Sequence, residues 1–192
     1  WMLDVNVYAS RAGHLVDLVE ENIDLALRLT KTPPEDAVAR KLVHMKRVIC
    51  ATPGYFAAHG EPRTPHELAH HACFSLLQLN ESRIWRLIDA QGEEVSVPVT
   101  SKFLFNDIDC VMNAVLAGHG IGMLPTYLCG PALARGELRK IFDDLEPLSS
   151  LGRYLYACYT PNRVRVPKVR VFLDELEKLF NPQPPWERPE AA

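Results

Sequence analysis

The sequence has no surplus of positive charge. Its 192 residues include 21 Lys and Arg against 24 Asp and Glu, a formal net charge of −3. A surface dedicated to nucleic acid needs a basic stripe to neutralise phosphates, and these residues offer none. Disorder as the main state is excluded as well, because 47% of the residues are hydrophobic and 23% are charged, as in ordinary globular chains. A chain of this length can bury a core as one large domain or two small lobes.

Paired cysteine motifs are also missing. The cysteines are Cys50, Cys73, Cys110, Cys129 and Cys158. Their number is odd, their spacing is wide, and no CxxC occurs, so neither a disulfide framework nor a zinc knuckle is predicted. A reducing cytoplasm is therefore the expected compartment.

The sequence also shows neither the pattern of a signal peptide nor that of a membrane-spanning segment. The chain opens with Trp1-Met2-Leu3-Asp4-Val5, which lacks a basic region followed by an apolar run. The longest stretch without Asp, Glu, Lys or Arg covers residues 110–134, and it contains four Gly and two Pro. Such a stretch is typical of a buried helix that leads into a buried strand, and no membrane span is expected.

The first thirty residues predict an α/β fold. Residues 3–9 alternate apolar and polar side chains, the period of a half-buried strand. Leu15, Leu18 and Val19 form one apolar helical face, and residues 24–29 follow as the next strand. A strand, a helix and a strand joined by short connections favour a parallel pair. Because the chain opens inside an element, we expect a truncated form of a longer protein.

Further elements follow from the same periodicities. Strands are predicted at 41–52, 74–79, 103–105, 121–124, 138–142 and 154–160, a hairpin at 84–88 with 94–99, and helices at 55–59, 65–71, 107–117, 127–135 and 167–180. The last helix places Val169, Phe172, Leu173, Leu176 and Leu179 on one face. The Pro-rich segment 181–192 is expected to be a disordered tail.

The most conspicuous catalytic pattern is His66-Glu67-Leu68-Ala69-His70, an HExxH sequence. On a helix, two histidines four residues apart can hold Zn²⁺ while the Glu activates water, so a zinc hydrolase is one alternative. However, Thr64-Pro65 immediately precedes the motif. This favours a capping box on a helix of about two turns, with Glu67 at its third position, and no metal.

Two other patterns concern small ligands. Gly118-His119-Gly120-Ile121-Gly122 resembles a phosphate loop, but it follows a helix and precedes a strand, the reverse of the order that a pyrophosphate loop needs, so a helix C-cap is predicted. Asn106-Asp107-Ile108-Asp109 is typical of a capped helix start. A helix start that faces a cleft also suits a carboxylate-bearing ligand, with Phe105 as an apolar wall. The nucleophile elbow GxSxG is absent.

Taken in order, these segments resemble the regulatory domain of LysR-type transcriptional regulators. The matching stretches are residues 15–28, 47–56, 64–73, 106–125 and 167–173. The resemblance covers about residues 3–180, and the family usually has a Gly where this chain has Asn22. The family also has a proline-led short helix at the HExxH position, without a metal.

The resemblance implies a type 2 periplasmic-binding-protein-like α/β fold, in which two lobes are joined by two crossovers and a small effector sits in the cleft. Residues 1–43 and 158–180 would form the first lobe and residues 44–157 the second. The implied effector-binding residues are Leu29, Thr30, Thr52, Phe105, Asn106, Asp107 and Ile121. No catalytic residue, metal or cofactor is expected.

The resemblance also sets the expected function and partners. The family's N-terminal helix-turn-helix, and the first strand and helix of its regulatory domain, are missing here, so DNA would be contacted only through that absent segment. The effector is expected to be a small carboxylate or aromatic acid. A homodimer or tetramer is expected, with the helix near residues 13–21 packed on the partner's other lobe. A solute-binding protein of the same fold and a ligand-free interaction module remain alternatives.

Overall fold

The computed structural model describes residues 17–18, 20–21, 23–76 and 83–188. It divides into two compact units, one containing the described residues up to His44 and from Leu151 onward, the other Met45–Ser150. The chain therefore passes between the units twice, as the resemblance implied. The first passage follows residue 44, close to the expected boundary. The second follows residue 150, whereas we expected it after 157.

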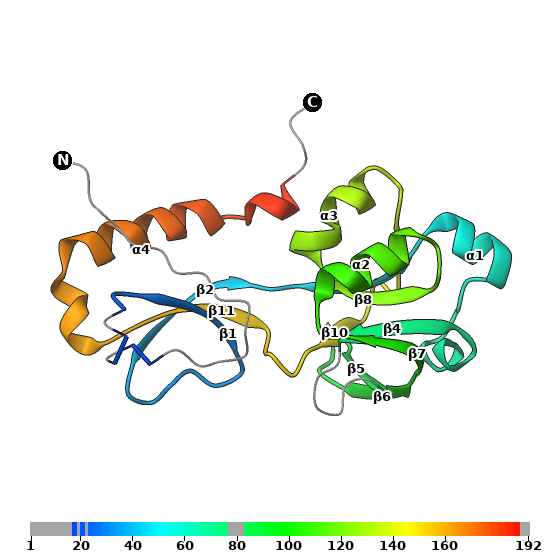
Figure 1. Cartoon of the computed structure of the whole chain (residues 1–192), viewed down its shortest axis with the longest axis horizontal. Helices are drawn as coiled ribbons and strands as arrows, with labels where there is room; N and C mark the ends of the chain where they lie inside the picture. Colours follow the sequence, from blue (N-terminus) through cyan, green and yellow to red (C-terminus); the bar gives the residue numbers. More distant parts are fainter. Residues whose placement is uncertain (1–16, 19, 22, 77–82, 189–192) are drawn as a thin grey trace. The chain divides into compact units, whose positions relative to one another are not determined.

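The first unit is built on a three-stranded antiparallel sheet (Figure 1). Its strands are β1 (Ala26–Thr30), β2 (Val38–His44) and β11 (Tyr154–Tyr159), in the order β1-β11-β2. Because β11 pairs along its length with both neighbours, the expected boundary after residue 157 would cut through a continuous strand. The strand predicted at 3–9 and most of the helix predicted at 13–21 lie outside the described residues.

Helix α4 (Pro167–Phe180) covers one face of this sheet, and its bounds are those predicted. Val169 and Leu173 pack on Ala157 and Tyr159 of β11. Leu179 was expected on this face but is 45% exposed, whereas Phe180 is buried in its place. A short 3₁₀ helix, η2 (Pro161–Arg165), leads into α4.

The segment after α4 is ordered as far as Arg188, so the prediction of disorder was wrong for residues 181–188. The indole ring of Trp186, in η3 (Pro185–Glu187), packs edge-on against Phe180 with ring centroids 5.7 Å apart. Arg188 donates from Nη2 to the carbonyl of Leu179, at 2.6 Å. The ring of Trp186 and the guanidinium group of Arg188 thus attach this segment to the end of α4. Its proline content alone had suggested a disordered chain. Residues 189–192 lie outside the described part.

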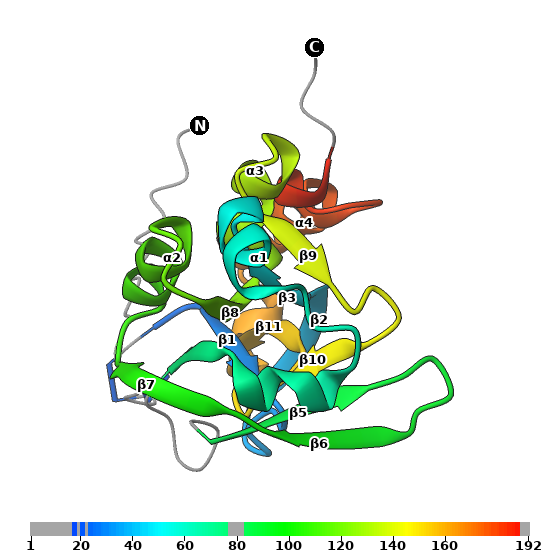
Figure 2. The ribbon, with the colours of Figure 1, turned by 90° about the vertical axis from the view of Figure 1, so that its right-hand side faces the viewer.

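The second unit contains two sheets. The five-stranded sheet has the order β7-β4-β8-β3-β9, and the three-stranded sheet the order β10-β5-β6. The strands are β3 (Arg47–Ala51), β4 (Ala72–Leu76), β5 (Ile84–Ile88), β6 (Glu94–Pro98), β7 (Thr100–Phe105), β8 (Ile121–Pro125), β9 (Arg139–Ile141) and β10 (Glu146–Leu148). The helices are α1 (Pro53–His59), η1 (Pro65–His70), α2 (Ile108–Leu116) and α3 (Thr126–Ala134). Figures 1 and 2 show α2 and α3 on one side of the five-stranded sheet and β5 and β6 on the other.

Successive side chains of the five-stranded sheet point to opposite faces and so contribute to two different hydrophobic cores. Ile49 and Ala51 of β3 belong to the core shared with Trp85 of β5, whereas Cys50 belongs to the core under α2 and α3. This is the period of two expected for a strand buried on both faces. The single strand predicted at 41–52 is in fact two, β2 and β3, because the chain passes from one unit to the other at Met45 and Lys46.

Several local predictions in the second unit are confirmed. β5 and β6 form the predicted antiparallel hairpin. Asp107 caps α2 by accepting a hydrogen bond from the Asp109 N–H at 2.9 Å. Gly118 ends that helix with a positive φ of 75°, a conformation that suits glycine. Strand β10, which contains Pro147, was not predicted. Within the described residues, no helix is both long and apolar enough to cross a bilayer.

Candidate functional site

Three of the residues expected to bind effector meet at one edge of the five-stranded sheet. Phe105 ends β7, and Asn106 and Asp107 lead directly into α2. Phe105 is half-buried against the α2 core, Asn106 is exposed, and Asp107 is engaged as the helix cap. Because β7 pairs in parallel with β4, Phe105 lies beside Leu76 where both strands end. The carboxyl edge of parallel strands is the usual place for ligands in α/β sheets.

Thr52 and Ile121 lie at the opposite ends of the strands in the same sheet, where β4 and β8 begin. Ile121 begins β8 and pairs with Cys73, three residues before Leu76, which places it about 10 Å along the strands from Phe105. Thr52 follows β3 and caps α1 by accepting a hydrogen bond from the Tyr55 N–H at 3.2 Å. The structure therefore does not bring these two residues to the Phe105 edge.

The remaining two expected residues belong to the first unit. Leu29 and Thr30 end β1, where they pair with Leu155 and Tyr154 of β11. The Thr30 hydroxyl donates to the carbonyl of Thr32 at 2.9 Å, so it shapes the turn that follows the strand. Both side chains are half-buried.

The HExxH sequence does not form a zincin helix. Residues Pro65–His70 form a 3₁₀ helix, in which side chains four residues apart do not share a face, so His66 and His70 point in different directions. Glu67 accepts hydrogen bonds from the Arg63 N–H at 2.9 Å and the Thr64 hydroxyl at 3.0 Å, and these lower the pKa of its carboxyl group. Glu67 thus reaches back over the helix start as predicted, although its backbone donor is Arg63 and not the N-cap residue Thr64.

The surroundings of the motif do not supply a metal site either. Burial raises the pKa of the Cys73 thiol to about 12, so this side chain is not a thiolate ligand at neutral pH. In the part of the chain that the structure describes, no group of three or more His, Cys, Asp or Glu side chains is placed to hold a metal ion.

His71, directly after the motif, has a structural role. The Tyr55 hydroxyl accepts a hydrogen bond from the Ala72 N–H at 3.2 Å and lies 3.2 Å from Nδ1 of His71. The Tyr55 hydroxyl can donate to Nδ1 or accept from it, depending on which ring nitrogen of His71 carries the proton. Burial, and secondarily the neighbouring His59, lower the pKa of His71.

We expect the burial of His71 to make stability depend on pH. A His pKa that is lower in the folded than in the unfolded state means that the unfolded state binds more protons, so stability falls as the pH drops from about 6.5 through the folded-state pKa. Thermal unfolding should show a lower Tm at acidic than at neutral pH, and His71→Gln should reduce this difference. An equal reduction in the control His66→Gln, at an exposed position on η1, would contradict the assignment to His71.

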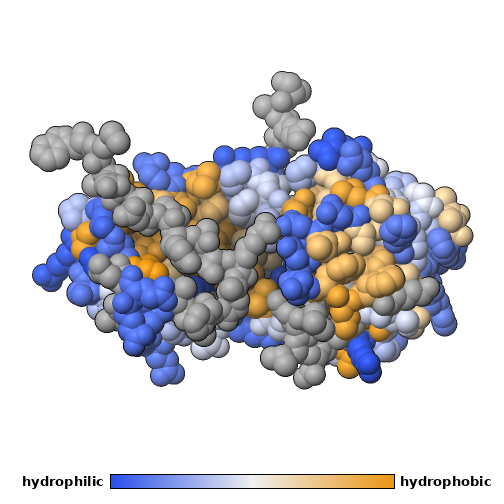
Figure 3. Space-filling view, viewed as in Figure 1, coloured by the Kyte–Doolittle hydropathy of each residue, from blue (hydrophilic) through white to orange (hydrophobic). Residues whose placement is uncertain are grey.

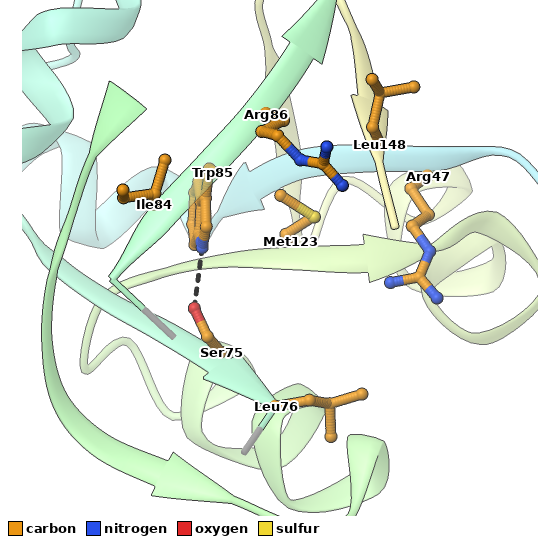
Figure 4. Close-up of a pocket in the computed structure, with 8 residues that line it drawn as sticks. All are labelled: Arg47, Ser75, Leu76, Ile84, Trp85, Arg86, Met123 and Leu148. Atoms are coloured by element: carbon orange, nitrogen blue, oxygen red, sulfur yellow. Dashed lines mark hydrogen bonds between the residues drawn. The ribbon is translucent and has the colours of Figure 1, made fainter. Parts of the chain in front are cut away.

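A hollow at the Phe105 edge was not predicted from the sequence. It lies between the two sheets of the second unit and has a cavity volume of about 20 Å³, room for about one water molecule. Its lining residues are Arg47, Ser75, Leu76, Ile84, Trp85, Arg86, Met123 and Leu148 (Figure 4). They come from five different strands, so no motif in the sequence could have grouped them.

Trp85, Met123 and the leucine side chains give the hollow apolar walls, and Arg47 and Arg86 also line it. Trp85 is 2% exposed and donates from Nε1 to the hydroxyl of Ser75 at 2.7 Å. Arg47 begins β3, and Arg86 projects from β5 with its Nη1 atom 3.6 Å from Oε1 of Glu94. The hollow thus combines the guanidinium groups of Arg47 and Arg86, the second of them close to Glu94, with a buried hydroxyl and hydrophobic walls.

Two α/β units between which the chain passes twice are the arrangement of the periplasmic-binding-protein-like class of domains. Residues 3–181 match the family model described as the LysR substrate binding domain. The chain therefore belongs to the LysR family and corresponds to its regulatory, effector-binding domain.

Individual relatives agree with this assignment. The chain is 30% identical over 163 residues to a probable HTH-type transcriptional regulator LtrA of Klebsiella pneumoniae, covering 85% of this chain and 52% of the relative. The full-length Vibrio cholerae virulence activator AphB matches with a TM-score of 0.72 and 25% identity, covering 87% of this chain and 55% of that one. The CrgA regulatory domain from Neisseria meningitidis matches with a TM-score of 0.66 and 27% identity, covering 83% and 76%.

These relatives are transcriptional regulators and not enzymes, as the sequence resemblance implied. The chain spans about half the length of the curated relatives that it matches.

Proposed function

We propose that this chain is the effector-sensing part of a LysR-type transcriptional regulator, which acts on DNA in the cytoplasm through a helix-turn-helix outside these residues. The observation that supports this proposal is the family match over residues 3–181, together with a net charge of −3 that leaves no basic stripe for DNA in this part. The proposed effector-binding residues are those that the resemblance implies: Leu29 and Thr30 in the first unit, and Thr52, Phe105, Asn106, Asp107 and Ile121 in the second.

An effector regulates only if it binds two states of the protein with different affinities. The proposed coupling is a shift in lobe position or in subunit packing that changes how the DNA-binding segments meet an operator.

The test has two arms. The purified chain is screened by thermal shift against small carboxylates and aromatic acids, since a ligand at a hundred times its Kd stabilises the folded state by about 2.7 kcal/mol. The coding sequence upstream of Trp1 is then examined for a helix-turn-helix, and effector-dependent operator binding is measured on the longer protein. Ligand binding without any upstream helix-turn-helix would instead support the solute-binding alternative. If no ligand binds and no helix-turn-helix is found upstream, the alternative of a ligand-free interaction module would be supported.

We further propose that the second unit contributes a face to a homodimer or to a tetramer built from it. Strand β7 is at the edge of its sheet, and Phe103 and Leu104 on it are 61% and 43% exposed. Leu116 on the neighbouring α2 is 37% exposed. Figure 3 shows hydrophobic side chains gathered on the face of this unit that carries α2 and β7. Edge strands with exposed apolar residues are usual pairing surfaces.

Substitution Phe103→Glu should weaken self-association at least about tenfold, because it places a charge in the centre of an apolar contact. Light scattering coupled to size exclusion over a concentration series measures the dissociation constant. Val171→Glu on α4 is the matched control, since Val171 is 47% exposed but lies in the first unit. A chain that is monomeric at every concentration, or an equal effect of both substitutions, would contradict this face as the interface.

A further inference from the structure

We propose that Tyr55 and His71 form a proton-responsive latch, which fixes helix α1 to the start of β4 at neutral pH and loosens when His71 is protonated. The latch connects the charge state of His71 to Thr52, the residue that caps α1. Thr52 is one of the residues proposed above to bind effector, and only there does the latch depend on the proposed function. All three residues belong to the second unit and to the described part of the chain.

Tyr55 is the centre of the latch. Its side chain is 5% exposed, and its hydroxyl oxygen accepts a hydrogen bond at 3.2 Å from the N–H of Ala72, the first residue of β4. The same hydroxyl lies 3.2 Å from Nδ1 of His71. The backbone N–H of Tyr55 donates to the Thr52 hydroxyl, also at 3.2 Å. A single residue thus joins His71 and the beginning of β4 to the cap of α1.

Protonation of His71 restricts the hydrogen bonds that the Tyr55 hydroxyl can form. A neutral imidazole has one donor and one acceptor nitrogen, so the hydroxyl can bond to Nδ1 in either direction, whereas in the imidazolium both nitrogens are donors. The phenol oxygen then faces two N–H donors, one from Nδ1 and one from Ala72, and its own proton can no longer be directed to His71. A cationic ring therefore changes the environment of Tyr55 at the contact that holds α1.

The titratable groups around His71 add like charge in acid. They are His59 of α1, and Glu67 and His70 of η1. His59 stacks on the Tyr55 ring with centroids 4.4 Å apart, and its Nδ1 lies 3.1 Å from the Tyr55 carbonyl oxygen. Three protonated imidazoles around one carboxylate repel one another, so acidification favours separation of α1 from the junction of η1 and β4. Burial, and secondarily His59, lower the pKa of His71, so the latch is closed at neutral pH.

The experiment is nuclear magnetic resonance of the whole chain from about pH 8 to about pH 5, the range in which histidine changes charge. We expect the backbone N–H signals of Thr52 and Tyr55 to shift along one titration curve, with the midpoint of the His71 ring, below about 6.5. His71→Gln keeps a polar side chain without a titratable charge and should abolish both shifts. Tyr55→Phe keeps the ring but not the hydroxyl, so His71 should still titrate while the two N–H signals no longer follow it.

Two further substitutions separate the latch from a general effect of acid. His59→Gln removes a like charge, so it should raise the midpoints of the His71 ring and of both N–H curves together. His66→Gln, at an exposed position on η1, is the matched control and should leave all three midpoints unchanged.

Three outcomes would overturn the latch. The N–H signals of Thr52 and Tyr55 could stay constant over the whole pH range, or they could still shift in His71→Gln. An unchanged response in Tyr55→Phe would show that the charge of His71 does not act through the hydroxyl. Because no effector is added, each of these results refutes the latch and leaves the proposed sensing function standing.

Discussion

Replacing Gly120 with alanine should lower the free energy of unfolding of the second unit by about 3 kcal/mol or more, a value in the upper range for a single substitution. A Cβ atom at this position would lie 2.3 Å from the carbonyl oxygen of Ala72 and 2.7 Å from Cε2 of Phe74. The oxygen belongs to the backbone where β4 begins, and β4 pairs with β8 directly after Gly120. Relief of the collision therefore requires that two paired strands separate.

The control for this prediction is Gly54→Ala in the first turn of α1. No heavy atom lies within 4 Å of a Cβ atom at Gly54. Alanine there should stabilise the unit by up to about 1 kcal/mol, because it favours the helical conformation more than glycine does. Urea unfolding followed by circular dichroism measures both variants. A Gly120→Ala protein as stable as the unsubstituted one would show that the two strands do not approach as closely as described.

Trp85→Ala should cost about 3–5 kcal/mol, the range for removing a large aromatic side chain from a core. Trp85 is the largest fully buried side chain among the residues that the structure describes, and it joins β5 to residues of β3 and β8 in one core. Its loss would also leave the hydroxyl of Ser75 without the indole donor. Trp85→Phe keeps most of the buried area and should cost clearly less, since only the hydrogen bond and part of the ring volume are removed.

Trp186→Ala is the matched control for the second prediction. Trp186 belongs to the first unit and is half-buried against Phe180, so its removal should cost about 1 kcal/mol. The measurement is again chemical unfolding, followed by circular dichroism because these substitutions remove tryptophan fluorescence. Equal losses in Trp85→Ala and Trp186→Ala would contradict the central place of Trp85 in the core.

The prediction of local elements succeeded where the signal is carried by neighbouring residues. Helix α4 has the predicted bounds, and α2 begins at the predicted cap Asp107 and ends before Gly118. Periodicity, capping oxygens and helix-ending glycines act within a few residues, so they can be recognised without knowledge of the fold. The predicted capping box at Glu67 was right only in part: its carboxylate accepts from the Arg63 N–H and the Thr64 hydroxyl, but the Thr64 side chain forms no capping hydrogen bond.

The predictions that failed depend on contacts between distant residues. Residues 41–52 were expected to be one strand because their apolar pattern is continuous, yet the chain changes units at Met45. Residues 181–192 were expected to be disordered, yet the ring of Trp186 packs against the ring of Phe180 at the end of α4. In both cases the deciding partner is a packed surface, which no local pattern specifies.

The sequence by itself determined the α/β pattern of local elements and the absence of a surplus of positive charge, and the order of its segments resembles the LysR regulatory domain, which the family match confirmed. Only the tertiary structure decided which residues share an edge. Strand register places Thr52 and Ile121 at the strand ends opposite to Phe105, and it brings Arg47 of β3 near Trp85 of β5. The physical reason is that register is set by hydrogen bonding and side-chain packing between strands distant in sequence, and these interactions leave no short-range pattern.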